Sequence, residues 1–207
     1  MIRLEVLGQH THLHSTLCGQ CPQGPAGCCA SPPAVAWADI GRITALGGSD
    51  WLLGEMRAGN LRPAPRGLAI RRSEATALDP RDPREGDRAE LRAWPRKCVY
   101  HGPTGCTVPS DRRSATCNYY LCDDAFEAGG EGRGDPIAAR ARGAHEALTD
   151  LYGRWDLELA ARIEARFPGG PPWDKAFFLW LAEQCAELEG ASRRELRALR
   201  AYRGKKG

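Results

Sequence analysis

The stretch CGQCPQGPAGCC, residues 18–29, places four cysteines within twelve residues. Four more follow at positions 98, 106, 117 and 122, and a ninth, Cys185, stands apart. Thiols this close in sequence form a disulfide knot, a redox device or a set of metal ligands. The compartment decides between these, because clustered thiols in a reducing cytosol are more often ligands or catalytic groups than structural disulfides.

The N-terminal residues give no sign of secretion. MIRLEVLGQHTHLHST lacks a basic region followed by an apolar run, and no stretch approaches the roughly 18 apolar residues of a membrane span. We therefore expect a cytoplasmic protein without a membrane segment. The formal net charge of +3, with 27% charged residues, is that of an ordinary soluble protein, and the 42% hydrophobic residues are enough for a core.

The spacing of the cysteines favours metal coordination. Cys18 and Cys21 are two residues apart, and a turn of that length brings both sulfurs to one ion. CVYHGPTGCTV predicts a β-hairpin with its turn at HGPTG, across which Cys98 meets Cys106. The vicinal pair Cys28–Cys29 serves two centres, or one thiol ligates while the other packs or reacts, because adjacent side chains diverge. The predicted ligands are Cys18, Cys21, Cys28, Cys29, Cys98, Cys106, Cys117 and Cys122.

Three segments resemble the YkgJ-type cysteine-cluster family: CGQC…CC, then AVAWADIGRI, and CVYHGPTGCTVPSDRRSATCNYYLC. The resemblance spans roughly residues 18–126. Cys106-Thr107-Val108 matches the middle element of the family, and Arg113 to Cys122 matches the closing R-P-x-x-C-R-x-(F/Y)-x-C segment, with Ser114 at the proline and Asn118 at the arginine. The family is described as a zinc- or iron-chelating domain. Some flagellin lysine methylases look similar in this cluster and are associated with an iron–sulfur centre.

The sequence therefore predicts a metal-binding protein that chelates zinc or iron, an iron–sulfur cluster being one form of the latter. Closed four-thiolate zinc sites are structural, whereas an iron–sulfur cluster is redox-active. Two alternatives stay open: a metalloenzyme that uses an iron or iron–sulfur centre to modify a protein or peptide, and a zinc-stabilised nucleic-acid-binding module. No phosphate-binding loop, G-x-S-x-G or H-E-x-x-H motif is present, so no catalytic residue or organic cofactor is predicted.

Histidines and the ninth cysteine have two interpretations each. His10, His12 and His14 alternate, so on a strand they face one side near Cys18, either as metal ligands or as an exposed polar face. His101 is either a solvent-facing turn residue or a hydrogen-bond donor beside Cys98. Cys185 lies on the apolar stripe of a predicted helix, where it either packs in the core, as we expect, or serves as a further ligand.

The predicted fold class is α+β and mostly α. Residues 1–135 form an irregular, cysteine-rich, metal-stapled half with a short β-hairpin, and this half packs on C-terminal helices. A strand is expected at residues 2–7, and a helix that carries Ile40 and Ile43 ends at Gly47-Gly48. Residues 54–97 are Arg/Pro-rich and predict a long irregular connection with one short strand at GLAIRR.

Residues 136–207 are predicted to be helical with a basic tail. Asp135-Pro136 is a typical helix start, and Phe167 with the Pro-Gly-Gly that follows ends the helix. A second helix spans about 172–189, and Ser192 to Glu195 reads as the capping box of a third. Residues 192–207 hold seven basic residues and one acidic residue. This tail is either a solvated terminus or a site for nucleic acid or an acidic protein partner.

Overall fold

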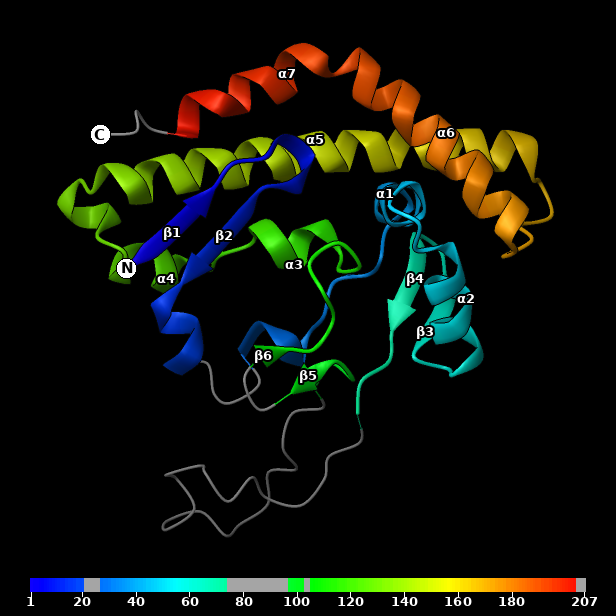
Figure 1. Ribbon diagram of the computed structural model, residues 1–207, viewed down its shortest axis with the longest axis horizontal. Helices are drawn as coiled ribbons and strands as arrows, with labels where there is room; N and C mark the ends of the chain where they lie inside the picture. Colours follow the sequence, from blue (N-terminus) through cyan, green and yellow to red (C-terminus); the bar gives the residue numbers. More distant parts are fainter. Residues whose placement is uncertain (21–26, 74–96, 103–104, 204–207) are drawn as a thin grey trace, which may run out of the picture.

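The long helix α5 (Pro136–Arg166) is the spine of the protein. The computed structural model describes residues 1–20, 27–73, 97–102 and 105–203. α5 begins where the sequence predicts: the Asp135 carboxylate accepts hydrogen bonds from the backbone N–H groups of Ile137 (2.7 Å) and Ala138 (3.1 Å), and Pro136 occupies the first turn. In Figure 1 the N-terminal elements lie below α5, while α6 crosses α5 and α7 lies above it.

Two further helices follow α5 and run back along it. α6 (Lys175–Ala191) starts at Asp174, whose carboxylate caps the N–H of Phe177, and α7 (Arg193–Ala198) continues into a 3₁₀ turn, η6 (Leu199–Arg203). The predicted capping box at Ser192 is wrong. The Ser192 hydroxyl accepts from Trp155 Nε1 at 2.9 Å, and Glu195 pairs with Arg154, so tertiary contacts displace the local cap.

α1 (Trp37–Ala45) packs mainly against α6 and also against α5. α2 (Ser49–Arg57) follows, and then a hairpin of β3 (Leu61–Ala64) and β4 (Gly67–Ile70), paired antiparallel with Leu61 opposite Ile70. The predicted helix and the predicted strand at GLAIRR are confirmed. Residues 61–64, predicted to be irregular, form the second strand of this hairpin. The rest of the predicted connection, 74–96, lies outside the described residues.

The N-terminal strands cover the other half of the spine. β1 (Ile2–Glu5) and β2 (His12–Ser15) pair antiparallel around the 3₁₀ turn η1 (Gly8–His10), with Glu5 opposite His12. α3 (Ala115–Tyr119) lies against β2 and α5, and α4 (Asp123–Ala128) leads through η5 (Glu131–Arg133) into α5. The predicted strand at residues 2–7 is confirmed, and it ends at Glu5.

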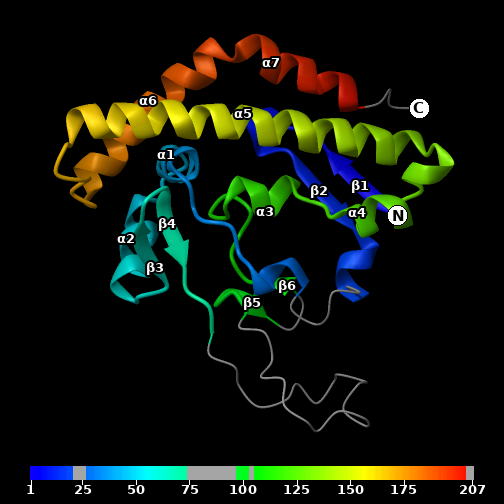
Figure 2. The same ribbon diagram turned by 180° about the vertical axis from the view of Figure 1, so that it is seen from behind.

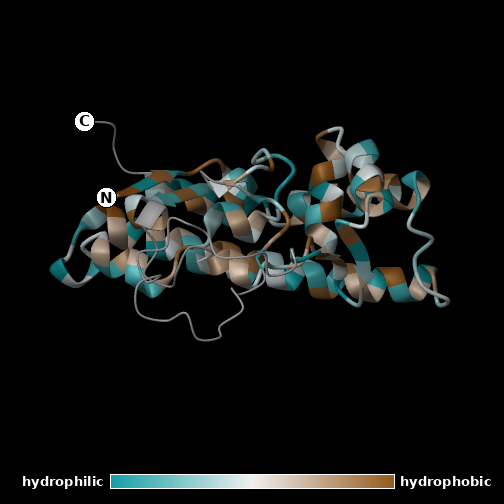
Figure 3. Ribbon diagram, turned by 90° about the horizontal axis from the view of Figure 1, so that it is seen from below, coloured by the Kyte–Doolittle hydropathy of each residue, from teal (hydrophilic) through white to brown (hydrophobic). Residues whose placement is uncertain are grey.

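One hydrophobic core joins the described residues of both predicted regions. It contains side chains from β1, α1, α3, α4, α5 and α6, among them Ile40, Phe126, Leu148 and Phe178, each fully buried. Figure 3 shows hydrophilic and hydrophobic residues side by side on the helices, as amphipathic packing requires. The predicted class, α+β and mostly α, is confirmed. No helix in the described parts of the chain is long and apolar enough to cross a membrane.

Three short elements, two of which carry cysteines, gather at the side of the molecule away from α6 and α7 (Figure 1). They are η3 (Gly27–Ala30), β5 (His101–Gly102) and β6 (Gly105–Cys106), while η2 (Thr16–Gln20) follows β2. Figures 1 and 2 show η3, β5 and β6 together from opposite sides. Segments far apart in the sequence therefore meet at this end.

Candidate metal centre

Five of the eight predicted ligands are neighbours: Cys28 and Cys29 in η3, Cys98 before β5, Cys106 in β6 and Cys117 in α3. The backbone N–H of Cys98 donates to the carbonyl of Cys29 at 2.7 Å. Burial raises the pKa of both Cys98 and Cys117. The charges of neighbouring thiols raise it further, those of Cys106 and Cys28 at Cys98 and those of Cys106, Cys98 and Cys28 at Cys117. Three segments of the chain thus bring their thiols within electrostatic reach of one another.

Cys98 is held by the hairpin that follows α2. It forms a β-bridge with Arg72, and the N–H of Val99 donates to the carbonyl of Arg71 at 3.0 Å. The predicted hairpin of residues 98–108 is present but short, and Cys106 lies opposite His101 rather than Cys98. Its turn residues 103 and 104 lie outside the described residues. Cys98 and Cys106 are close because the chain before β5 folds back, not because they face each other across the strands.

Arg113 closes the loop that follows Cys106. Its Nε donates to the carbonyl of Val108 at 2.6 Å and its Nη2 to that of Cys106 at 3.4 Å. The Asn118 amide donates to the carbonyl of Ser110 at 2.8 Å. These bonds fix the path from Cys106 to Cys117 with side chains, since the loop contains little regular structure.

The start of α3 is capped by a carboxylate from another helix. Asp39 of α1, 2% exposed, accepts from the Ser114 hydroxyl (2.8 Å) and the Ala115 N–H (2.6 Å). Its charge is paired with Arg42 at 3.3 Å, and Arg42 in turn donates to the carbonyl of Arg113. Further hydrogen bonds offset part of the cost of burying such a pair: both terminal nitrogens of Arg42 donate to carbonyls, of Asp111 and Arg113, while its Nε has no partner among the described residues. The position of Cys117 is therefore set by α1, a link that the sequence pattern did not reveal.

The thiols differ in acidity. The Cys29 thiol donates a hydrogen bond to Cys28, which lowers the pKa of Cys28 to about 6 and raises that of Cys29. Cys117 keeps exposed surface, yet protein atoms surround its sulfur, and this desolvation together with the neighbouring thiols raises its pKa to about 12. Cys28 is thus available as a thiolate at neutral pH, and a cation would be needed to favour deprotonation of Cys29 and Cys117.

The remaining cysteines lie at the edge of this group. Cys122 occupies the N-cap position of α4. Burial is the main cause of the raised pKa of Tyr120, and the charges of Cys122 and Cys28 raise it further. Cys18 is in η2, which contacts α4. Cys21 lies outside the described residues. Within residues 1–20, 27–73, 97–102 and 105–203, no three His, Cys, Asp or Glu side chains are arranged to hold a metal ion.

The histidines of the N-terminal hairpin face away from the core. Leu13 and Ser15 are buried in β2, so His12 and His14 point to the other face, opposite Glu5 and Arg3. His10 belongs to η1 instead of the strand. Partial burial, with Arg42 nearby, lowers the pKa values of His10 and His12. His101 pairs with Cys106 across the short hairpin, which places it beside the cysteine group.

Cys185 packs between helices, as its position on the apolar stripe predicts. Its Sγ lies 3.9 Å from the carbonyl of Ala38, and a Cβ added at Gly41 would stand 2.1 Å from this sulfur. Burial raises its pKa to about 12. Cys185 belongs to the α1–α6 contact, apart from the other thiols.

Two polar residues of α5 lie in this framework although the sequence analysis did not single them out. His145 stands among Tyr119, Tyr120 and Phe126, with Nδ1 3.2 Å from the Tyr119 carbonyl. Asp156 accepts from the N–H of Ala38 at 2.8 Å and so caps α1 from outside. In the sequence, each of these two residues could have been recognised as a polar residue beside the apolar stripe of the predicted helix.

Comparison with known proteins gives no relative. No family model matches this chain, and no match was found among curated proteins or among solved structures.

Proposed function

We propose that this chain is a metal-binding protein that chelates zinc or iron through its clustered cysteines. The observation that carries the proposal is the meeting of five thiols from three distant segments, Cys28–Cys29, Cys98–Cys106 and Cys117. Thiols that raise one another's pKa repel when deprotonated, and a divalent or iron cation offsets that repulsion while thiolate sulfur is a preferred ligand of both metals.

The donor set fits such an ion in its chemistry. The residues that would hold it are Cys28 or Cys29, Cys98, Cys106 and Cys117, and the remaining three predicted ligands, Cys18, Cys21 and Cys122, would complete a second centre or extend the first. Zinc bound in this way stabilises the fold, and an iron–sulfur cluster supplies redox chemistry. The resemblance to the YkgJ-type family is part of this proposal and supports metal chelation above any particular reaction.

Elemental analysis and visible absorption of anaerobically purified protein test the proposal. We expect zinc or iron in stoichiometric amount, colourless protein if zinc and brown protein if an iron–sulfur cluster. Alanine at Cys98, Cys106 or Cys117 lowers the metal content, whereas Cys185→Ala, which removes a thiol of the α1–α6 contact that is half-buried like Cys106, leaves it unchanged. Protein that stays folded without metal and takes up neither ion on reconstitution overturns the proposal.

A further inference from the structure

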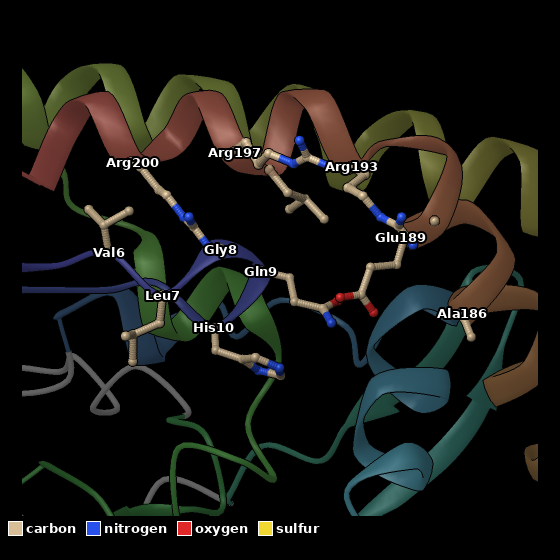
Figure 4. A pocket seen from close by; sticks show the side chains of 12 residues that line it. Val6, Leu7, Gly8, Gln9, His10, Ala186, Glu189, Arg193, Arg197 and Arg200 are labelled. Carbon is tan, nitrogen blue, oxygen red and sulfur yellow. The ribbon is translucent and has the colours of Figure 1, made fainter.

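A cavity of about 730 Å³ lies on the side of the molecule opposite the cysteines. One wall is the turn Val6–His10 between β1 and β2, and the other is the end of α6 with α7 and η6. Figure 4 shows the side chains of both walls facing the space between them. Cavities of roughly 300–1,000 Å³ accommodate small molecules.

Three arginines of one helical face line this cavity: Arg193, Arg197 and Arg200. Their spacing, i, i+4 and i+7, places them on one side of α7 and its continuation. All three are exposed, and among the described residues none of them forms an ion pair or a hydrogen bond. In Figure 4 the Arg200 side chain reaches from the helix toward Gly8.

The arginines of the neighbouring helix contrast with these. On α5, Arg154 pairs with Asp150 and Glu195, and Arg162 pairs with Glu158 and Glu187. Glu195 is the one acidic residue of α7, and its pairing with Arg154 directs it away from the cavity. These acidic side chains thus pair with the arginines of α5, and none of them pairs with Arg193, Arg197 or Arg200.

The turn Val6–His10 contributes Gln9 and His10 to the cavity, and the end of α6 contributes the acidic Glu189. The Gln9 carbonyl accepts from the Tyr152 hydroxyl at 3.2 Å, which anchors the turn on α5, while its amide faces the cavity. Glu189 lines the cavity near Arg193, and the Gln9 and Glu189 side chains point toward one another in Figure 4. Val6, Leu7 and Leu196 add apolar surface.

We propose that this cavity binds a small organic anion whose phosphate or carboxylate groups pair with Arg197 and Arg200 and whose hydroxyl or amino group donates to Glu189. Guanidinium forks bind both kinds of oxyanion in bidentate geometry. The site is independent of the metal and of the proposed metal-binding function.

Isothermal titration of the full chain with pyrophosphate and with citrate at physiological salt tests the proposal and separates phosphate from carboxylate. We expect saturable binding of at least one probe. Arg197→Ala combined with Arg200→Ala weakens it at least tenfold, and Glu189→Gln strengthens pyrophosphate binding by removing a repelling charge. The matched control is Arg194→Ala, since Arg194 is an exposed arginine of the same helix that does not line the cavity; it changes the affinity less than twofold.

Absence of saturable binding for both probes overturns the proposal. So does an equal loss in the Arg194→Ala variant, because binding would then depend on total charge. A single-stranded oligonucleotide that binds with equal sensitivity to Arg194 and Arg197 identifies a general polyanion surface instead of a small-molecule site. Circular dichroism of each variant shows that the fold is kept, as expected for exposed side chains without ion pairs.

Discussion

Asp39 and Ser114 are 75 positions apart in the chain, and their side chains are joined by a buried hydrogen bond of 2.8 Å. The bond connects α1, in the helical core, to the first turn of α3, which carries Cys117. With the Arg42 pair it forms the main polar link between the core and the cysteine end. Its removal is therefore a direct test of how the candidate centre is positioned.

Asp39→Asn is expected to destabilise the fold by about 3–5 kcal/mol, because it leaves the buried Arg42 without its counter-charge. Denaturant unfolding measures the change. Asp50→Asn is the control: Asp50 pairs with Lys175 at the surface at 2.9 Å, a contact worth at most about 1 kcal/mol. Equal losses in the two variants would contradict the role given to Asp39.

The carboxyl of Asp156 predicts a pH dependence of stability. Burial raises its pKa to about 7, whereas an aspartate in the unfolded chain titrates near about 4. Between these values the folded state binds more protons, so this group's contribution to the free energy of unfolding is fully present below pH 4 and is lost as the pH rises to 7.

Asp156→Asn removes this titration and keeps an oxygen to accept from the Ala38 N–H. The stability difference between wild type and variant, measured by urea unfolding, should therefore favour wild type increasingly as the pH falls from 7 to 4, by up to about 1.4 kcal/mol per pH unit. A difference that is constant across this range would show that Asp156 titrates normally.

Gly41 permits the closest approach between α1 and α6. Gly41→Ala should destabilise the protein by about 1–3 kcal/mol, because the new Cβ would meet the Cys185 sulfur at 2.1 Å. Adding Cys185→Ala should restore part of that loss, which thermal unfolding measures. Gly54→Ala on α2, where nothing lies within 4 Å, is expected to be neutral or stabilising. Failure of the second substitution to rescue would place the clash elsewhere.

Cys28 should react faster than Cys117 and Cys185 in metal-free, reduced protein. Its pKa is lowered to about 6, while burial raises those of Cys117 and Cys185 to about 12. Alkylation followed by peptide mass spectrometry should give a midpoint near pH 6 for Cys28. Cys29→Ala removes the hydrogen bond to Cys28 and shifts that midpoint upward. An unchanged midpoint would mean that Cys29 does not stabilise the thiolate.

Elements that depend on local signals were predictable. The start of α5 at Asp135-Pro136 and the strand at Ile2–Glu5 follow from a cap and from apolar alternation. The capping box at Ser192 failed because Trp155 and Arg154, on another helix, bind its two polar side chains more favourably than the helix end does. A short-range motif cannot anticipate such a competitor.

The sequence indicates which cysteines belong to the candidate site, but not the contacts that position them. Their spacing indicates a shared site, but pairing with Arg71 and Arg72 holds the Cys98–Val99 segment, and Cys106 lies opposite His101 in the short hairpin instead of opposite Cys98. The cap that Asp39 provides for α3 spans segments with no local pattern in common. Long-range polar contacts of this kind arise only once packing has brought both partners together.

The cap that Asp39 of α1 provides for α3 also determines which parts of the fold a metal ion bound at the cysteines would stabilise. α1 packs against α6 and α5, and the same carboxylate anchors the segment that presents Cys117. An ion that binds the thiols only in the folded arrangement stabilises, by thermodynamic linkage, every contact on which that arrangement depends. Metal binding at the cysteine end should consequently slow amide hydrogen exchange in the middle of α5, a helix that carries none of the proposed ligands.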